Sequence, residues 1–526
     1  MRRLAVPSLF QHLRRPALTA LSAVALLVAS GVITGAGTPA ARAQALPSLG
    51  DGSGMTVAAE RALGDSIARS IYRDPDYLDD PLLGDYLQSI WQPLLSAARS
   101  RGDVDPELAE RLAWELMISR DRTVNAFALP GGYLGVNLGL LSVTETPQEL
   151  ASVLAHELSH VSQRHIARMI SQQDRQAPWL IGAMILGALA AKSSVDAANA
   201  AIVGSQAVAA QTQLNFSRDM EREADRVGFG VLTTAGFPGE GFVSMFDKLQ
   251  QASRLNDDGG FPYLRSHPLT TERIADMKAR LPLAPARPVG PVLQAAATVT
   301  PDQEIHTMMS ARARVMAENG PDRLQVWLRN GQEAKAGLGA RYAAALAASR
   351  LGRHDQAEQL AAQVARQAGP AGQRHAEWLQ LEVGLTALQQ RGRSTPSADW
   401  LTWRDRALAS GTRAGLLLGA QAALASGVPR EAAQRLHGWV IERPRDALAW
   451  QTLSRAEMAQ GQRLRSVRAE AEARAAQLDW QGALERFRAA QALPAPDRSA
   501  DPVELAIVDA RAREMDQKVR ELARKN

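Results

Sequence analysis

Apolar residues recur with helical spacing along most of the chain, and one short stretch alternates as a strand does. Residues 57–280 mix helical patterns with that single strand-like stretch. Residues 301–526 are rich in alanine, leucine, arginine and glutamine, and their pattern predicts helices throughout. The sequence therefore predicts a mainly α protein with a mixed region followed by an entirely helical one.

The strand-like stretch predicts an edge strand or hairpin of a small β-sheet. Phe127 and Leu129 precede a Pro-Gly-Gly turn, and Leu134, Val136 and Leu138 follow it with a period of two. Turn chemistry between two alternating runs is typical of a hairpin.

The helical region shows internal repetition. Gly427 and Gly461 are 34 residues apart, the length of a two-helix repeat unit. Small residues and a closing proline recur around such turns, in the sets Gly427, Ala432 and Pro444; Gly352, Ala357 and Pro370; and Ala483, Phe487 and Ala490. These sets resemble tetratricopeptide repeats, four to six of them, interrupted at 391–400. A non-repeating helical bundle is the alternative.

Prolines and the first residues of the chain suggest the remaining boundaries. Prolines recur every third residue between 282 and 291, which suits an extended linker. The first 43 residues combine a basic start, a long uncharged apolar run and Ala-Arg-Ala at 41–43, the pattern of a secretory signal peptide. An uncleaved membrane anchor is the alternative. We predict a signal peptide at 1–43, a first domain at 44–280, a Pro-rich linker at 281–300 and a helical repeat domain at 301–526.

Charge and cysteine content exclude several classes of function. Five of the 60 basic residues lie in 1–43, which has no acid, so the rest of the chain, with 55 acidic residues, has no net charge. No global basic field favours nucleic acid as a partner. The chain has no cysteine, which excludes disulfides, a thiol nucleophile and a cysteine zinc site.

One helix carries the pattern of a metal site. Thr146 is a good N-cap, Pro147 suits the first helical position and Glu149 completes a capping box, so a helix begins there. His156 and His160 then lie one turn apart and project from one face.

Two imidazoles on one helical face, with a glutamate between them, suit a zinc site that catalyses hydrolysis. Two histidines and a carboxylate leave one position of tetrahedral zinc open to water. Glu157 can take a proton from that water and pass it to the leaving amine. Two surface histidines are the plain alternative. His165 lies five positions after His160 and is expected to point elsewhere on the helix.

A second helical pattern offers the third ligand. Glu221 and Asp225 lie one turn apart; Glu221 is the natural carboxylate ligand, and Asp225 could accept a hydrogen bond from a liganded histidine. Glu223 should face elsewhere. The alternative is a solvated acidic face paired with the neighbouring arginines Arg218, Arg222 and Arg226.

These two motifs give the chain a family resemblance. His156-Glu157-x-x-His160 followed by Glu221-x-x-Ala224-Asp225 resembles the zinc metallopeptidases of the HtpX and CAAX-prenyl-endopeptidase family. The export signal and the repeats are similar to its BepA-like branch, protease-chaperones that serve outer-membrane protein assembly. The resemblance implies a helical metallopeptidase domain with a small sheet, followed by a repeat domain. It also implies one Zn²⁺ held by His156, His160 and Glu221, and an edge strand that pairs with extended substrate.

A Ser-His-Pro stretch supplies one further candidate residue. By itself it predicts only a turn, but in the family branch this histidine, here His267, approaches the zinc. There it could occupy the fourth position and keep the enzyme latent, or donate to the oxyanion. Our candidate catalytic residues are Glu157, Asp225 and His267, while Arg273 is expected to be structural or to face substrate.

An apolar segment at 177–191, interrupted only by Pro178 and glycines, is too short to span a bilayer. It predicts either a buried helix or an exposed element that touches a membrane or an unfolded client near the cleft. The resemblance favours a lid-like segment.

Taken together, the sequence predicts an exported zinc endopeptidase, and the resemblance implies that it is periplasmic, degrades misfolded or stalled outer-membrane proteins and assists their assembly. The resemblance implies unfolded outer-membrane proteins as substrates and the barrel assembly machinery as a partner of the repeats. A non-proteolytic scaffold with a closed structural zinc site is the main alternative. A secreted digestive protease is disfavoured because bulk digestion has no use for a repeat domain.

Overall fold

The computed structural model describes residues 54–172, 217–255, 261–281, 301–391, 396–499 and 501–525. The predicted signal peptide, the apolar segment 177–191 and nearly all of the predicted linker lie outside these residues. The described residues, from Gly54 onward, belong to one unit. None of the described helices is both long and apolar enough to cross a bilayer.

The first part of the chain is mixed, as predicted. Its elements are α1 (Val57–Ile71), β1 (Tyr77–Leu78), α2 (Pro81–Ser100), α3 (Pro106–Arg111), β2 (Glu115–Ser119), β3 (Ala126–Leu129), η1 (Pro130–Gly132), β4 (Tyr133–Asn137), α4 (Leu138–Val143), α5 (Pro147–Ser162), α6 (His165–Gln172), α9 (Arg218–Thr234), α10 (Glu240–Leu255), α11 (Tyr263–Ser266) and α12 (Thr271–Arg280).

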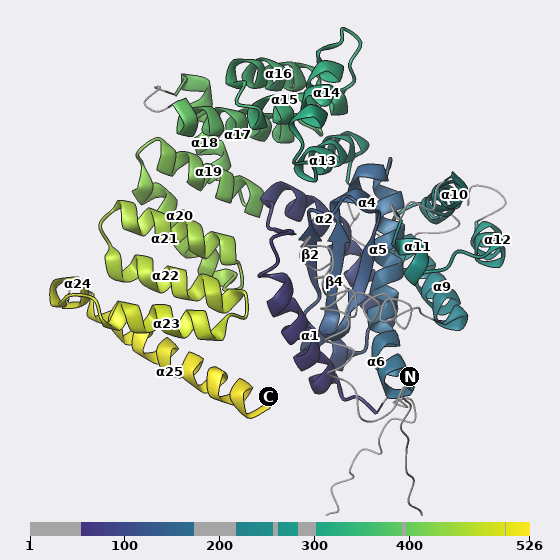
Figure 1. Cartoon of the computed structure of the whole chain (residues 1–526), viewed down its shortest axis with the longest axis horizontal. Coiled ribbons are helices and arrows are strands. Elements are labelled where there is room, and N and C mark those ends of the chain that lie inside the picture. Colours follow the sequence, from purple (N-terminus) through teal and green to yellow (C-terminus); the bar gives the residue numbers. More distant parts are fainter. Residues whose placement is uncertain are drawn as a thin grey trace, which may run out of the picture. The chain divides into compact units, whose positions relative to one another are not determined.

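Within the described residues, four strands form one small sheet in the order β1-β2-β4-β3. Strands β3 and β4 pair antiparallel around the Pro-Gly-Gly turn, which confirms the predicted hairpin and leaves β3 at the edge. The prediction was wrong at Leu138, which begins α4 instead of continuing β4. It also missed β1 and β2, although β2 pairs in parallel with β4 over five residues. Helix α5 contacts the edge strand β3, and Figure 1 shows α5 beside the sheet, next to β4.

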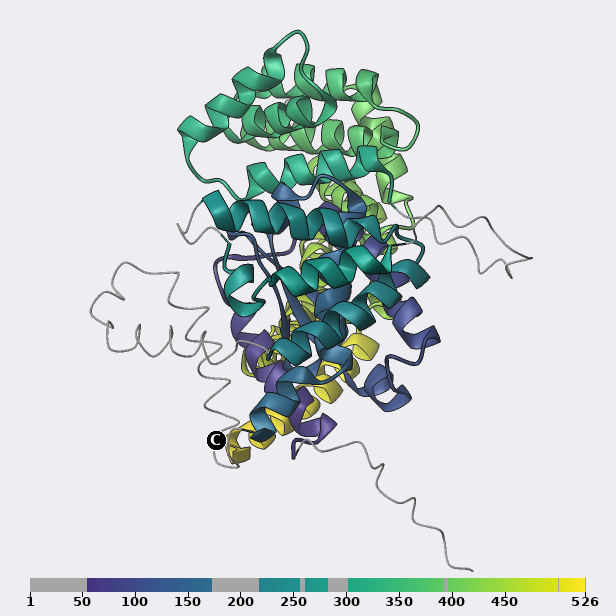
Figure 2. The same cartoon turned by 90° about the vertical axis from the view of Figure 1, so that its right-hand side faces the viewer.

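The second part of the described chain is entirely helical. Its elements are α13 (Gln303–Met316), α14 (Pro321–Gln332), α15 (Leu338–Arg350), α16 (His354–Gln367), α17 (Gln373–Arg391), α18 (Ala398–Leu408), α19 (Arg413–Ala425), α20 (Pro429–Glu442), α21 (Ala447–Ala459), α22 (Arg463–Ala476), α23 (Trp480–Gln491), α24 (Ala495–Ser499) and α25 (Pro502–Lys525). Neighbouring helices from α14 to α23 pack mostly on one another in succession (Figures 1 and 2).

The residues singled out by the repeat pattern occupy equivalent places. Gly352, Gly427 and Gly461 each follow one helix and precede the next with φ between +72° and +80°, a conformation that glycine adopts without strain. Ala357 and Ala432 are fully buried in the following helices. The helical region therefore has a repeat-like architecture, while the number of repeats and the domain boundaries stay predictions.

Helix α2 joins the two parts through one continuous apolar core. It contacts α5 and α9 of the first part and α13 and α19 of the second, and all of these helices contribute buried residues to the same core. Asp80, at the start of α2, forms an ion pair with the buried Arg312 of α13 (2.6 Å). The helical region is thereby fixed to the helix that supports α5 and α9.

Candidate metal centre

Helix α5 brings two candidate ligands into the core. It begins as predicted, because Thr146 Oγ1 accepts a hydrogen bond from the Glu149 amide (3.3 Å). The reciprocal bond of the capping box is displaced by one residue, since the Glu149 carboxylate accepts from the amide of Glu145 (2.7 Å). Further along the helix, His156 and His160 are both buried, so the alternative of two surface histidines is wrong.

Helix α9 packs against α5 and brings two acids to the histidines. Glu221 and Asp225 are each 1% exposed, so the alternative of a solvated acidic face is wrong. Gly228 permits this close approach. A Cβ atom at that position would lie 3.1 Å from the carbonyl oxygen of Ala155 and 3.2 Å from His156 Cα. A larger residue there would push the two helices apart.

His267 reaches the same place from the end of α11. Its imidazole stacks on Tyr263, with ring centroids 4.6 Å apart. His267 Nδ1 lies 2.9 Å from Glu221 Oε1 and 3.3 Å from His156 Nε2. The Ser-His-Pro stretch therefore contributes a side chain to the cluster and is more than a turn.

Four donor groups converge with the spacing of a metal site. One donor atom each of His156, His160, Glu221 and His267 lies within 4.8 Å of all the others. His160 Nε2 is 3.0 Å from His156 Nε2 and 3.4 Å from Glu221 Oε1. Zinc bonds nitrogen and oxygen at about 2.0–2.1 Å, which separates tetrahedral ligands by about 3.3 Å. Donor types and distances thus fit such an ion.

The electrostatics of the cluster also favour a cation. Burial lowers the pKa of His160, which keeps its imidazole in the neutral form that binds metals. Burial would lower the pKa of His156 as well, but hydrogen bonds to Asp225 and Glu221 raise it to about 10. The pKa of Glu221 is held low despite burial by His267 and by hydrogen bonds to the histidines. A cation bound among the four donors would therefore stabilise the negative charge of the buried carboxylates.

Arg273, which we placed outside the candidate catalytic residues, holds both acids. Its Nε and Nη2 donate to the two oxygens of Asp225 at 2.7 and 2.8 Å, and its Nη1 lies 2.8 Å from Glu221 Oε2. Asp225 Oδ1 in turn lies 3.0 Å from His156 Nδ1. A carboxylate in that position fixes the orientation and tautomer of a ligand histidine.

His165 is a residue that sequence reasoning placed wrongly. The chain leaves the helical conformation at Arg164 (φ +52°), so the angular argument that pointed His165 away does not hold. His165 Nδ1 lies 2.8 Å from His160 Nδ1, and its Nε2 lies 3.1 Å from Glu223 Oε2. Arg168 also bonds Glu223 (2.9 Å). Glu223 faces away from the four donors, as predicted. It nevertheless supports His160 indirectly, because it bonds His165, which contacts His160.

Glu157 lies between the cluster and the edge strand. It is fully buried, and its Oε2 accepts a hydrogen bond from the amide of Ala128 in β3 (3.0 Å). Its Oε1 lies 3.4 Å from His267 Nε2. Burial raises the pKa of Glu157, which brings it toward the range useful to a general base.

A buried His-Glu-x-x-His helix, a carboxylate from a second helix and an adjacent edge strand define a metallopeptidase. The chain belongs to peptidase family M48, whose sequence model matches residues 86–281. This confirms the predicted metallopeptidase resemblance, and the family implies a bound metal. The protein is accordingly a metalloendopeptidase.

Individual relatives extend the likeness to the helical region. The chain is 30% identical over 439 residues to a beta-barrel assembly-enhancing protease of Escherichia coli, covering 82% of this chain and 83% of that protein. A putative beta-barrel assembly-enhancing protease of Vibrio cholerae is 34% identical over 274 residues, about half (52%) of each chain. The mitochondrial metalloendopeptidase OMA1 of Saccharomyces cerevisiae is 28% identical over 203 residues, 38% of this chain and 56% of that protein.

Proposed function

We propose that the protein is a zinc endopeptidase, exported to the periplasm, that degrades misfolded or stalled outer-membrane proteins and assists their assembly. The observation that carries the proposal is the convergence of His156, His160 and Glu221 beside Glu157 and the edge strand. The names of the two bacterial relatives support outer-membrane β-barrel proteins as clients. The predicted signal peptide supports export, and the helical region is our candidate for docking on the barrel assembly machinery.

Each residue of the centre has a distinct part in this mechanism. His156, His160 and Glu221 would hold the ion, while Asp225 and Arg273 orient two of these ligands. Zinc, when bound, supplies a Lewis acid that polarises the scissile carbonyl and acidifies the attacking water. Glu157 accepts the proton of that water and returns it to the leaving amine.

The edge strand suits clients of varied sequence. An extended peptide can add to β3 through main-chain hydrogen bonds, which do not depend on side chains. Only unfolded segments offer a free main chain, so this mode of binding selects misfolded or stalled proteins over folded ones.

The test is zinc-dependent cleavage of an unfolded outer-membrane barrel protein by purified residues 44–526. We expect chelation to stop cleavage and Zn²⁺ to restore it. Cleavage that continues after the bound metal has been shown to be gone would refute the proposal.

The position of His267 favours a second candidate function, a non-proteolytic scaffold. Four donors from the protein itself can close a tetrahedral site, and a closed site is the pattern of structural zinc. In that case zinc would stabilise the fold, and the protein would keep clients soluble without cutting them.

Replacing His267 distinguishes the two candidates. In the endopeptidase, His267→Ala opens the fourth position, and we expect cleavage to accelerate by at least about tenfold if the open form is ordinarily a minor state. His437→Ala, in the distant helix α20, is the control for loss of a histidine. A His267→Ala protein that keeps zinc but cuts nothing would favour the scaffold.

The contact of Glu223 with His165 predicts an effect on metal affinity. Residues that orient a ligand histidine typically change metal affinity about 10–100-fold when removed, so Glu223→Ala should weaken zinc binding by about tenfold or more. Asp219→Ala removes an exposed acid from the first turn of the same helix and should leave affinity unchanged. Competition with a chromophoric chelator measures the zinc affinity of both variants. Equal affinities of Glu223→Ala and Asp219→Ala would contradict a role of Glu223 and His165 in orienting His160.

A further inference from the structure

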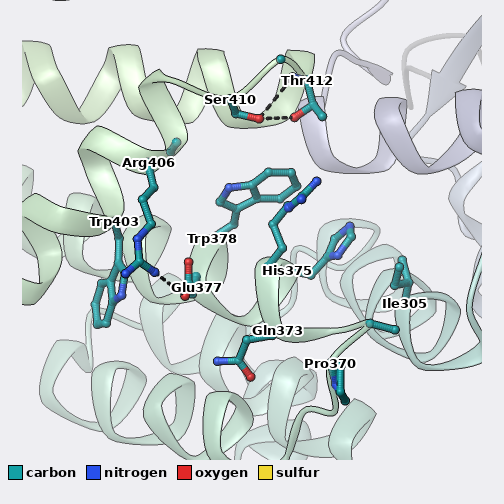
Figure 3. A pocket seen from close by; sticks show the side chains of 14 residues that line it. Ile305, Pro370, Gln373, His375, Glu377, Trp378, Trp403, Arg406, Ser410 and Thr412 are labelled. Carbon is teal, nitrogen blue, oxygen red and sulfur yellow. Dashed lines mark hydrogen bonds and ion pairs between the residues drawn. The ribbon is translucent and has the colours of Figure 1, made fainter.

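The helical region contains a cavity to which the proposed function gives no role. Its volume is about 720 Å³, within the range of about 300–1,000 Å³ typical of ligand sites (Figure 3). The cavity is lined by α17, by α18 and by the turn that leads into α19, with Ile305 of α13 at one side. No residue of the metal centre lines it.

Two tryptophans give the cavity aromatic walls. Trp378 of α17 is 6% exposed and thus held in the core, while Trp403 of α18 is half-buried and packed against the same core. Both residues line the cavity; Figure 3 shows the Trp378 indole in its middle and the Trp403 indole at its left edge, beside Arg406. Rigid aromatic surfaces of this kind bury a large apolar side chain at little cost in conformational entropy.

The cavity also carries excess positive charge. Arg406 forms an ion pair with Glu377 (2.9 Å), and its side chain stays 62% exposed. Arg374 is exposed and makes no hydrogen bond or ion pair with any residue that the structure describes. One acid therefore faces two guanidinium groups, which leaves a charge available to an anionic ligand.

A neutral histidine completes the lining of the cavity. His375 Nδ1 is buried, and no described residue offers it a hydrogen bond. Burial and the neighbouring Arg374 lower the pKa of His375 to about 4, so the ring is neutral and packs edge-on against Trp378 (5.2 Å). This nitrogen has almost no accessible surface, so His375 contributes its neutral ring to the lining and offers no hydrogen-bonding group to a ligand.

The rim is fixed before any ligand arrives. The amides of Gly369 and Gly372 both donate to the Glu304 carboxylate (2.6 and 2.9 Å), which anchors the loop before α17. On the opposite side, the hydroxyls of Ser410 and Thr412 lie 3.0 Å apart in a hydrogen bond, and Thr412 also caps α19. A preformed site loses less entropy when it binds.

We propose that this cavity binds a carboxylate-bearing segment of an extended polypeptide, with an aromatic or large apolar side chain beside the carboxylate. The carboxylate would lie between Arg374 and Arg406, and the apolar side chain would lie against Trp378 and Trp403. A neutral apolar ligand would leave Arg374 unpaired, and a basic ligand would meet like charge. The proposal goes beyond the proposed function, because it does not depend on cleavage.

The experiment measures peptide binding to the full mature chain carrying Glu157→Gln, so that cleavage cannot remove the probe. The probes are fluorescent hexapeptides that end in phenylalanine with a free carboxyl, the same peptide as the amide, and an amidated peptide with an internal aspartate beside phenylalanine. We expect the free acid, the internal acid or both to bind at least about tenfold more tightly than the neutral amide. The acidic peptide that binds shows whether the site takes a C-terminal carboxylate or the carboxylate of an aspartate side chain. Equal binding of all three, or no binding, would overturn the proposal.

Two variants and a control locate the site. Arg374→Gln should weaken binding of the acidic peptide by about tenfold, whereas Arg366→Gln, an exposed arginine of α16 outside the cavity, should not. A Cβ atom at Gly411 meets no atom within 4 Å, so Gly411→Asp adds a repelling charge at the rim without loss of a packing contact. It should also weaken binding while the unfolding temperature stays the same. Wild-type affinity in both variants would overturn the proposal.

Discussion

Replacing Glu157 with glutamine is expected to reduce cleavage by about 10²–10⁴-fold while the protein keeps its metal. Glutamine has the same shape, and its carbonyl oxygen can still accept the hydrogen bond from the Ala128 amide. What the variant lacks is a carboxylate that can take a proton from the attacking water. The four metal donors do not include Glu157, so the loss should appear in the rate of cleavage and leave zinc content unchanged.

Glu149→Gln is the matched control, because it makes the same exchange at a buried position of the same helix. Glu149 bonds the Glu145 amide and Lys248, remote from the donors, so cleavage should stay near the wild-type rate. Cleavage rates and zinc content of both variants are measured with the same unfolded barrel protein. Continued cleavage by Glu157→Gln would remove this residue from the mechanism.

The parts of the centre that the sequence predicted are those set by spacing within one element. A helix start at Thr146 fixes the register that puts His156 and His160 on one face, and the same argument applies to Glu221 and Asp225. Spacing does not say which helical faces pack together, because that depends on contacts between elements. The family resemblance supplied the expectation that Glu221 meets His156 and His160.

The features that were missed depend on a local break in the backbone or on contacts between residues far apart in the sequence. Arg164 breaks the helix by adopting a positive φ, and this turns His165 back toward His160. Strand β2 reads Glu-Leu-Met-Ile-Ser, with three adjacent apolar residues in place of alternation, so its pattern does not identify a strand without its partner β4. Arg273 was expected to be structural or to face substrate, but its partners could not be named from the sequence, because they lie on α9 about 50 residues earlier.

Replacing Arg273 with methionine should be the most damaging change to the local stability of the centre. Methionine fills a similar volume, but it leaves the Asp225 carboxylate buried without its two strongest hydrogen bonds. Burial alone would raise the pKa of Asp225, whereas hydrogen bonds from Arg273 and His156 hold it below its usual value. Removal of one partner of a buried ion pair typically costs about 3–5 kcal/mol. The loss should appear as reduced hydrogen-exchange protection of α9 together with weaker zinc binding.

Arg280→Met provides the comparison on the same helix, α12. Arg280 pairs with Asp276 one turn away, and both side chains are substantially exposed (32% and 49%), so its loss should change stability by no more than about 0.5 kcal/mol. Arg273→Lys separates charge from geometry, because an ammonium keeps the charge but cannot bond both oxygens of Asp225 as the planar guanidinium does. An intermediate loss for lysine would show that the paired geometry contributes beyond charge. Arg273→Met with wild-type protection in α9 and unchanged zinc affinity would mean that Asp225 and Glu221 are held without it.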